Sequence, residues 1–154
     1  MRTALDVHIS EVGPRDGLQS VKATMLTADK CRWIDALAAA GLREIEVGSF
    51  VPAKLLPQMA DVAAVVRHAL TLTVSHPGLR VMALVPNRRG AEAALAAGVH
   101  KLTLPVSASE AHSLANVRKT SAQMVEELHS VVALRNEVAP GVPVEVGLST
   151  AFGC

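Results

Sequence analysis

The chain has 154 residues, half of them apolar and 19% charged, which is typical of one soluble globular domain with a sizeable core. Its 15 basic and 14 acidic residues nearly balance and are spread along the sequence, so it has no basic patch for nucleic acid or an anionic membrane. No apolar run approaches the ~20 residues of a membrane span, no targeting peptide precedes the first predicted strand, and Cys31 and Cys154 form no disulfide framework, so we expect a cytoplasmic protein.

Short strand-like runs alternate with longer helix-like runs, as in βα units around a parallel sheet. The predicted strands are residues 5–12, 43–47, 79–85, 100–104 and 142–148. The predicted helices are residues 27–40, 57–70, 88–97 and 120–138. Gly41 and Gly98 follow two of these helices, where a left-handed C-cap residue is favoured. Right-handed crossovers of this kind build either a closed barrel or an open doubly wound sheet.

The loops after the predicted strands help to separate these two architectures. Neither Gly-x-Gly-x-x-Gly nor a P-loop follows the first strand, which disfavours a nucleotide-binding open sheet. Polar side chains instead gather after successive strands, a distribution typical of a TIM-type barrel, whose site is collected from many strand ends. They include Arg15, Asp16, Gln19, Glu46, Ser49, Asn87, Ser107 and Ser149.

The stretch Glu11-Val12-Gly13-Pro14-Arg15-Asp16-Gly17-Leu18-Gln19 directly follows the first predicted strand. Pro14 has no amide hydrogen, so it ends the strand and holds Arg15 and Asp16 just past the strand's carboxyl end. An adjacent arginine and aspartate with Gln19 nearby can bind an anion and a cation. The alternative reading is a solvated Arg-Asp-Gly turn with Gln19 at the start of a helix.

This stretch resembles the first-strand signature of the 3-hydroxy-3-methylglutaryl-CoA (HMG-CoA) lyases, which are metal-dependent, aldolase-like barrels. The resemblance continues through residues 45–61, 85–98 and 149–154, so it is collinear over almost the whole chain. It implies an α/β fold in which residues 1–154 are the N-terminal part of one TIM-barrel catalytic domain, with the first five strands and four helices of a (β/α)₈ barrel. Because eight strands need ~250 residues, we expect the chain to be truncated, without the family's later His-x-His and Asn metal ligands and its cysteine loop.

The resemblance implies a carbon–carbon lyase that cleaves HMG-CoA, or a related 3-hydroxyacyl-CoA, to acetyl-CoA and acetoacetate by metal-assisted retro-aldol (Claisen-type) cleavage. This is a reaction of leucine degradation and ketone body metabolism. Asp16 is then a ligand of a divalent cation, Mg²⁺ or Mn²⁺, which prefers oxygen ligands. Arg15 faces the thioester and stabilises the enolate charge. Glu46 either takes part in catalysis or orients its neighbours by pairing with Arg15. The implied substrate-binding residues are Arg15, Gln19, Ser49 and Asn87.

Other readings stay open. A condensing acyl-CoA synthase of the isopropylmalate or citramalate kind is a near alternative, although Gly13-Pro14 before Arg15-Asp16 favours the lyases. A different class is a non-catalytic half barrel that associates with a partner, or forms a homo-oligomer through its open edges. His112 is a candidate base, but a lone loop histidine is more often a surface residue. With a single metal carboxylate, we expect little or no lyase turnover from this chain alone.

Overall fold

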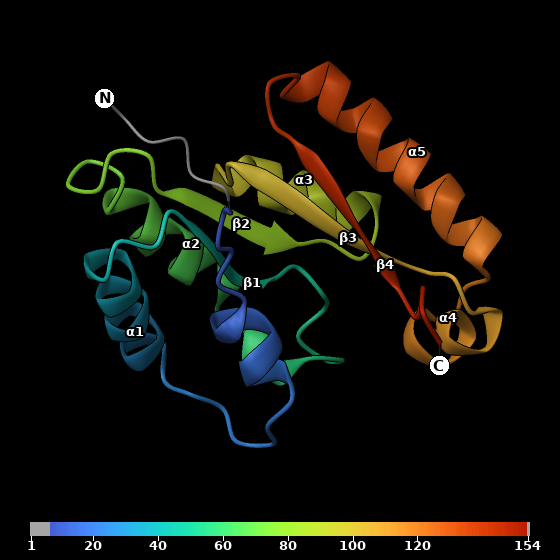
Figure 1. The fold of residues 1–154 in the computed structure, drawn as a ribbon, viewed down its shortest axis with the longest axis horizontal. Coiled ribbons are helices and arrows are strands. Elements are labelled where there is room, and N and C mark those ends of the chain that lie inside the picture. The colour runs from blue at the N-terminus through green and yellow to red at the C-terminus, as the bar shows by residue number, and fades with distance from the viewer. Residues whose placement is uncertain (1–6, 154) are drawn as a thin grey trace.

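In the computed structural model, which describes residues 7–153, four strands form one parallel sheet with helical connections (Figure 1). The strands are β1 (Glu44–Ser49), β2 (Arg80–Leu84), β3 (Lys101–Ser107) and β4 (Val144–Ser149), and their order in the sheet is the order in the chain. Each strand pairs with the next in parallel. The predicted alternation of strands and helices around a parallel sheet is therefore confirmed.

The helices form where the sequence supplies helix formers and caps. They are α1 (Thr27–Ala39), α2 (Val62–Thr71), α3 (Arg88–Ala97), α4 (Glu110–Val117) and α5 (Ser121–Val138), with short turns η1 (Gly13–Gly17) and η2 (Pro57–Met59). Thr120 and Gln123 form a capping box at the start of α5. None of the helices described is long and apolar enough to cross a lipid bilayer.

The two faces of the sheet differ because successive side chains of a strand point to opposite sides. One face is apolar and packs against helices α1, α2, α3 and α5, which contribute Ile34, Val65, Ala94 and Met124 to the core. The strand residues on this face include Ile45, Val47, Val81, Leu102 and Leu104. The opposite face carries Glu44, Glu46, Met82, Lys101 and Thr103. Polar side chains thus accumulate on the face that the core does not use.

The first predicted strand, residues 5–12, is not a strand in the structure. Residues 5 and 6 lie outside the described residues, and within the rest only Glu11 makes a parallel bridge, to Ile45. The Glu11 N–H donates to Glu44 O at 2.9 Å, and the Glu46 N–H donates to Glu11 O at 2.8 Å. Pro14 and the helical backbone of Val12 end the pairing at once. The segment therefore lies beside β1, as the barrel prediction requires, but without a ladder.

Two other predicted elements differ clearly in extent, and one helix was not predicted. The predicted helix at 57–70 is divided into η2 and α2, and β3 continues through Pro105 to Ser107, past the predicted end at residue 104. Helix α4 lies where a loop was predicted. Local capping residues mark its two ends. Ser109 Oγ accepts the N–H of His112 at 3.3 Å, and Arg118 ends the helix in a left-handed conformation with φ of 56°. Helix α4 has only eight residues, too few to show a helical period clearly.

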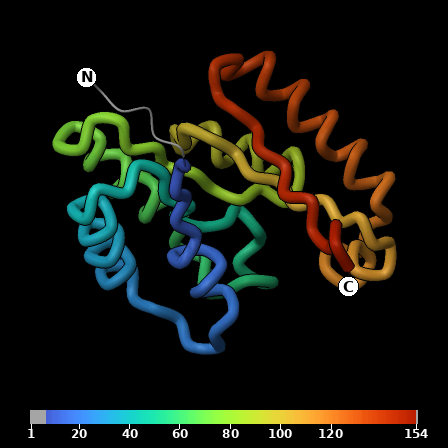
Figure 2. Tube along the Cα trace, in the orientation of Figure 1, coloured from blue at the N-terminus to red at the C-terminus, as the bar shows by residue number. Residues whose placement is uncertain are grey.

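The last described residues lie at the carboxyl end of the parallel sheet. In Figure 2 the tube of β4 runs beside β3 and finishes close to α4. The Ala108 N–H donates to Ser149 O at 2.9 Å, and the Ser109 N–H donates to Thr150 Oγ1 at 3.2 Å. These bonds hold the carboxyl ends of β3 and β4 together.

Candidate active site

A cavity of about 980 Å³ lies on the polar face of the sheet, toward the carboxyl ends of the strands. Its wall combines residues of η1, the four strands, the loop after β1 and helix α4. All the predicted site residues line it, namely Arg15, Asp16, Gln19, Glu46, Ser49 and Asn87. Residues separated by more than 70 positions are thus brought to one cavity, at the face where parallel α/β folds bind ligands.

The turn η1 places Arg15 and Asp16 at the cavity. The N–H groups of Arg15 and Asp16 both donate to Val12 O, at 3.0 and 2.7 Å, and the Gly13 N–H donates to Glu11 Oε1 at 2.6 Å. A Cβ at position 13 would lie 2.7 Å from that carboxylate oxygen and 3.1 Å from Trp33, so any larger residue would displace the Glu11 carboxylate and crowd the indole. The Gly-Pro pair therefore turns the chain sharply from Glu11 into the site.

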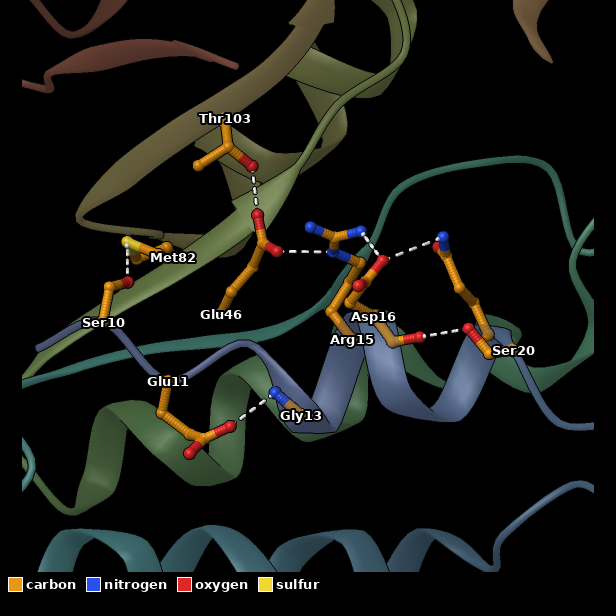
Figure 3. Close-up of polar contacts among 10 residues, drawn as sticks. Ser10, Glu11, Gly13, Arg15, Asp16, Ser20, Glu46, Met82 and Thr103 are labelled. Atoms are coloured by element: carbon orange, nitrogen blue, oxygen red, sulfur yellow. Dashed lines mark hydrogen bonds and ion pairs between the residues drawn. The ribbon is translucent and has the colours of Figure 1, made fainter. Parts of the chain in front are cut away.

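A chain of polar contacts runs from β3 through β1 to η1 (Figure 3). Thr103 Oγ1 donates to Glu46 Oε1, and Arg15 Nε donates to Glu46 Oε2. Arg15 Nη1 donates to Asp16 Oδ1 at 2.7 Å, and Gln19 Nε2 donates to the same oxygen at 3.3 Å. Glu46 is only 1% exposed, and its carboxylate is engaged at both oxygens, as a buried charge requires.

The expected pairing of Glu46 with Arg15 is present, whereas Thr103 was not among the predicted residues. A signal for Thr103 exists in the sequence. Leu102 and Leu104 are both buried against the helices, so the threonine between them must face the opposite side, with Glu46. The alternating pattern places it on the correct face, but only the fold shows which residue it contacts.

Ser49 and Asn87 both line the cavity, but they differ in whether their side chains already have a hydrogen-bond partner. Ser49 is fully buried, and its hydroxyl has no hydrogen-bond partner among the described residues. Asn87 is the N-cap of α3, and its Oδ1 accepts the N–H of Gly90 at 2.9 Å. The Ser49 hydroxyl is therefore unengaged, whereas the Asn87 oxygen is already used and only its amide nitrogen remains for a ligand.

His112 also lines the cavity, but from helix α4 and not from a loop. Its Nδ1 lies 2.8 Å from Ser107 Oγ, a contact that fixes the ring and leaves Nε2 as its second polar atom. Lys119, another lining residue outside the prediction, pairs with Glu127. Burial raises the pKa of Glu127, but hydrogen bonds from Lys119 and the Arg88 N–H outweigh it and leave that pKa lowered. This rim of the cavity is therefore charged and fixed.

A second group of charges lies on the same face, where Lys101 contacts two carboxylates. Its Nζ lies 2.9 Å from Glu44 Oε1 and also contacts Glu145. Burial works against both charges, but the mutual hydrogen bonds outweigh it, so the pKa of Glu44 is lowered and the pKa of Lys101 is raised. Glu44 and Lys101 therefore stay ionised near neutral pH, and the three side chains connect β1, β3 and β4.

The residues present do not make up a complete site for a divalent cation. Asp16 is exposed and offers a carboxylate whose Oδ1 already accepts from Arg15 and Gln19, and both Glu46 oxygens are engaged. No group of three or more His, Cys, Asp or Glu side chains in the described part of the chain is arranged to hold a metal ion. Asp16 can therefore contribute one ligand and not a full coordination shell.

The HMGL-like family model matches residues 6–153. The chain is 41% identical, over 148 residues, to 3-hydroxy-3-isohexenylglutaryl-CoA/hydroxy-methylglutaryl-CoA lyase of Pseudomonas aeruginosa, covering 96% of this chain and 47% of the relative. The crystal structure of Bacillus subtilis HMG-CoA lyase superposes with a TM-score of 0.87 at 37% identity, over 96% of this chain and 48% of that one. The structure of an Acinetobacter baumannii HMG-CoA lyase in complex with coenzyme A and 3-methylmalate superposes with a TM-score of 0.86 at 33% identity. The match covers 96% of this chain and 46% of that one.

The chain spans about half the length of the curated relatives it matches. Its parallel sheet and helices correspond to the N-terminal half of the HMG-CoA lyase TIM barrel, so the predicted fold class is confirmed. The resemblance read from the motif at residues 11–19 is confirmed as well, since it extends over nearly all of the sequence.

Proposed function

The chain belongs to the HMGL-like family, and from that membership we propose that it is the N-terminal part of the catalytic domain of a carbon–carbon lyase. The substrate is HMG-CoA or a related 3-hydroxyacyl-CoA, and the products are acetyl-CoA and acetoacetate or its homologue. The lyase names of the relatives favour this reaction over a condensing synthase. Leucine degradation, ketone body metabolism and a cytoplasmic location belong to the same proposal.

The observation that carries the proposal is the guanidinium of Arg15 at the cavity. When the carbon–carbon bond breaks, its electron pair passes to the acetyl-CoA fragment as an enolate, and the hydroxyl group of the other fragment gives its proton to a base as its carbonyl forms. A proton taken up at the enolate carbon then completes acetyl-CoA. An arginine keeps its charge throughout and can stabilise the enolate oxygen. Because Glu46 and Asp16 both hold Arg15, this stabilising charge is in place before the substrate arrives.

Other cavity residues have roles in binding. The unengaged Ser49 hydroxyl donates a hydrogen bond to a substrate oxygen, and Gln19 and the Asn87 amide nitrogen supply further donors. The proposal includes Mg²⁺ or Mn²⁺ with Asp16 as one oxygen ligand. Since the described residues do not complete its shell, no step of the reaction is assigned to the ion.

Release of acetyl-CoA from HMG-CoA tests the proposal, in the chain and in any longer protein that contains it. Arg15→Gln is expected to lower kcat by about 100-fold or more, the usual cost of losing one donor to a developing oxyanion. Arg32→Gln is the matched control, because the Arg32 side chain is 78% exposed and lies away from the cavity. Absence of turnover in a longer, folded protein supplied with either ion would contradict the function, and unchanged turnover in Arg15→Gln would contradict the role of Arg15.

The role of Asp16 has a separate readout. Asp16→Asn is expected to weaken Mn²⁺ binding, measured by the electron paramagnetic resonance of the free ion, because an amide binds a hard cation less tightly than a carboxylate. Asp29→Asn is the control, because Asp29 is half-buried and does not line the cavity. Unchanged Mn²⁺ affinity in Asp16→Asn would contradict the ligand assignment.

A further inference from the structure

Thr103 occupies an unusual position relative to the site. It belongs to β3, two strands away from β1 in the sheet, and the longer Glu46 side chain reaches across β2 to its hydroxyl (Figure 3). The nearest cation on β3, Lys101, is already engaged by Glu44 and Glu145 and does not contact Glu46. Thr103 is therefore the second of the two side chains described that hold the Glu46 carboxylate, and Arg15 is the first.

The two contacts together restrict the carboxylate more than either one alone. The last torsion of a glutamate side chain has a broad energy profile, so a carboxylate held at one oxygen still rotates. With Thr103 on Oε1 and Arg15 on Oε2, that rotation is blocked. The position of the Arg15 guanidinium then depends on a hydroxyl that does not itself contact Arg15.

We propose that Thr103 is a positioning residue for Arg15 that acts through Glu46. Its hydroxyl fixes the carboxylate, and the carboxylate fixes the guanidinium at the cavity. The kinetic part of this inference rests on the proposed lyase function, whereas the positioning of Arg15 is a property of the folded chain and can be measured without turnover.

The first test measures how rapidly phenylglyoxal modifies Arg15, read by peptide mass spectrometry and normalised to the exposed Arg32. Thr103→Val removes the hydroxyl and keeps the branched shape, so we expect Arg15 to react several-fold faster. Thr103→Ser keeps the hydroxyl and is expected to restore the original rate. Thr71→Val is the matched control, since the exposed Thr71 hydroxyl donates only to His68 O in α2. An unchanged Arg15 rate in Thr103→Val would overturn the proposal.

The second test is the division between kcat and KM for acetyl-CoA release by a longer, folded protein that contains the chain. Misplacing a catalytic group by about an ångström costs up to about 100-fold, so Thr103→Val is expected to lower kcat by about 10- to 100-fold with little change in KM. Thr103→Ser is expected to recover most of that loss. A fall in stability with unchanged kcat and unchanged Arg15 reactivity would show a merely structural role and overturn the proposal.

The two tests separate the positioning role from the proposed function. If Arg15 becomes more reactive in Thr103→Val but a longer, folded protein that contains the unsubstituted chain releases no acetyl-CoA, the lyase function fails and the positioning role stands. If the unsubstituted protein is active and neither readout responds to Thr103→Val, the positioning role fails and the function stands. Should the valine variant not fold, Thr103→Ala removes the same hydroxyl without placing a methyl group beside the carboxylate.

Discussion

Substitution of the single residue Ser49 is expected to affect ligand binding without lowering stability. Because the Ser49 hydroxyl is buried and has no hydrogen-bond partner in the described protein, Ser49→Ala removes no internal bond and is expected to leave the unfolding free energy unchanged or to raise it. It should weaken acetyl-CoA binding by about 1 kcal/mol, or about fivefold in Kd, the value of one hydrogen bond. Calorimetric titration and urea unfolding measure the two quantities.

A second buried serine provides the control for this prediction. Ser113 in α4 is also fully buried without a hydroxyl partner, but it does not line the cavity. Ser113→Ala is expected to have the same effect on stability as Ser49→Ala and no effect on binding. Equal Kd values for the Ser49→Ala and unsubstituted chains would remove Ser49 from the proposed substrate contacts.

The site residues differ in how far the sequence can predict them. Arg15, Asp16 and Gln19 are contiguous and punctuated by Gly13 and Pro14, so local chemistry places them together past a strand end. Thr103 contacts a carboxylate 57 positions away, and that contact follows from sheet register, which periodicity does not specify. Asn87 was predicted only as a substrate-binding residue. It also caps the N-terminus of α3, a role that an asparagine before a helix commonly has.

At the scale of elements, Lys30 joins α1 to the segment before α2. It is 2% exposed, and its Nζ lies 2.5 Å from Asp61 Oδ1 and 2.5 Å from Gln58 O. Thr27 Oγ1 donates to Asp61 Oδ2 at 2.7 Å. A buried lysine on the core side of α1 therefore anchors the connection from β1 to α2, which lines the cavity through Leu55 and Leu56.

Replacing Lys30 by methionine is expected to lower the unfolding free energy by about 3 kcal/mol, because Asp61 then loses its charged partner. Urea unfolding measures the change. Lys54→Met is the control, since Lys54 is exposed in the same connection, and it should stay within about 0.5 kcal/mol. A Lys30→Met chain as stable as the control would show that the pair does not anchor this segment.

The same pair predicts a dependence on pH. Burial raises the pKa of Asp61, but hydrogen bonds from Lys30 and Thr27 outweigh it, so the pKa lies below its ordinary value of 3.8. Its contribution to stability is complete above pH 3.8 and is lost as the pH falls through the lowered pKa. The difference between the Lys30→Met and unsubstituted chains should therefore shrink on acidification below that pH, and a constant difference would contradict this assignment.

The predicted helices agree with the structure where the helical pattern extends over several turns, as in α1, α3 and α5. The disagreements have local physical causes. Helix α4 is too short to show its period, and residues 7–10 alternate like a strand although no partner extends the ladder beyond Glu11. Strand pattern specifies which faces are compatible with a core, whereas a ladder also needs a neighbouring backbone in register.

At the scale of the whole molecule, the polar face of the sheet is held together by the group around Lys101. Glu44 on β1, Lys101 on β3 and Glu145 on β4 span the sheet, so this one cation connects strands that are not all neighbours. Glu44 and Lys101 are largely buried, and each pays a desolvation cost that the other offsets. The arrangement is therefore sensitive to removal of one charge and tolerant of removal of both.

Lys101→Met is expected to lower the unfolding free energy by about 3 kcal/mol, because it leaves the Glu44 carboxylate buried beside an apolar side chain. Adding Glu44→Gln should recover more than half of that loss, since the uncompensated charge is gone. Urea unfolding of both single variants and the double variant measures the coupling. The pKa of Glu44 is lowered from 4.5 and that of Lys101 is raised from 10.5, so in the unsubstituted chain the contribution of the pair is lost as the pH falls through the lowered pKa of Glu44 or rises through the raised pKa of Lys101. Additive effects of the two substitutions would show that the charges act independently and that the polar face is held by its backbone pairing alone.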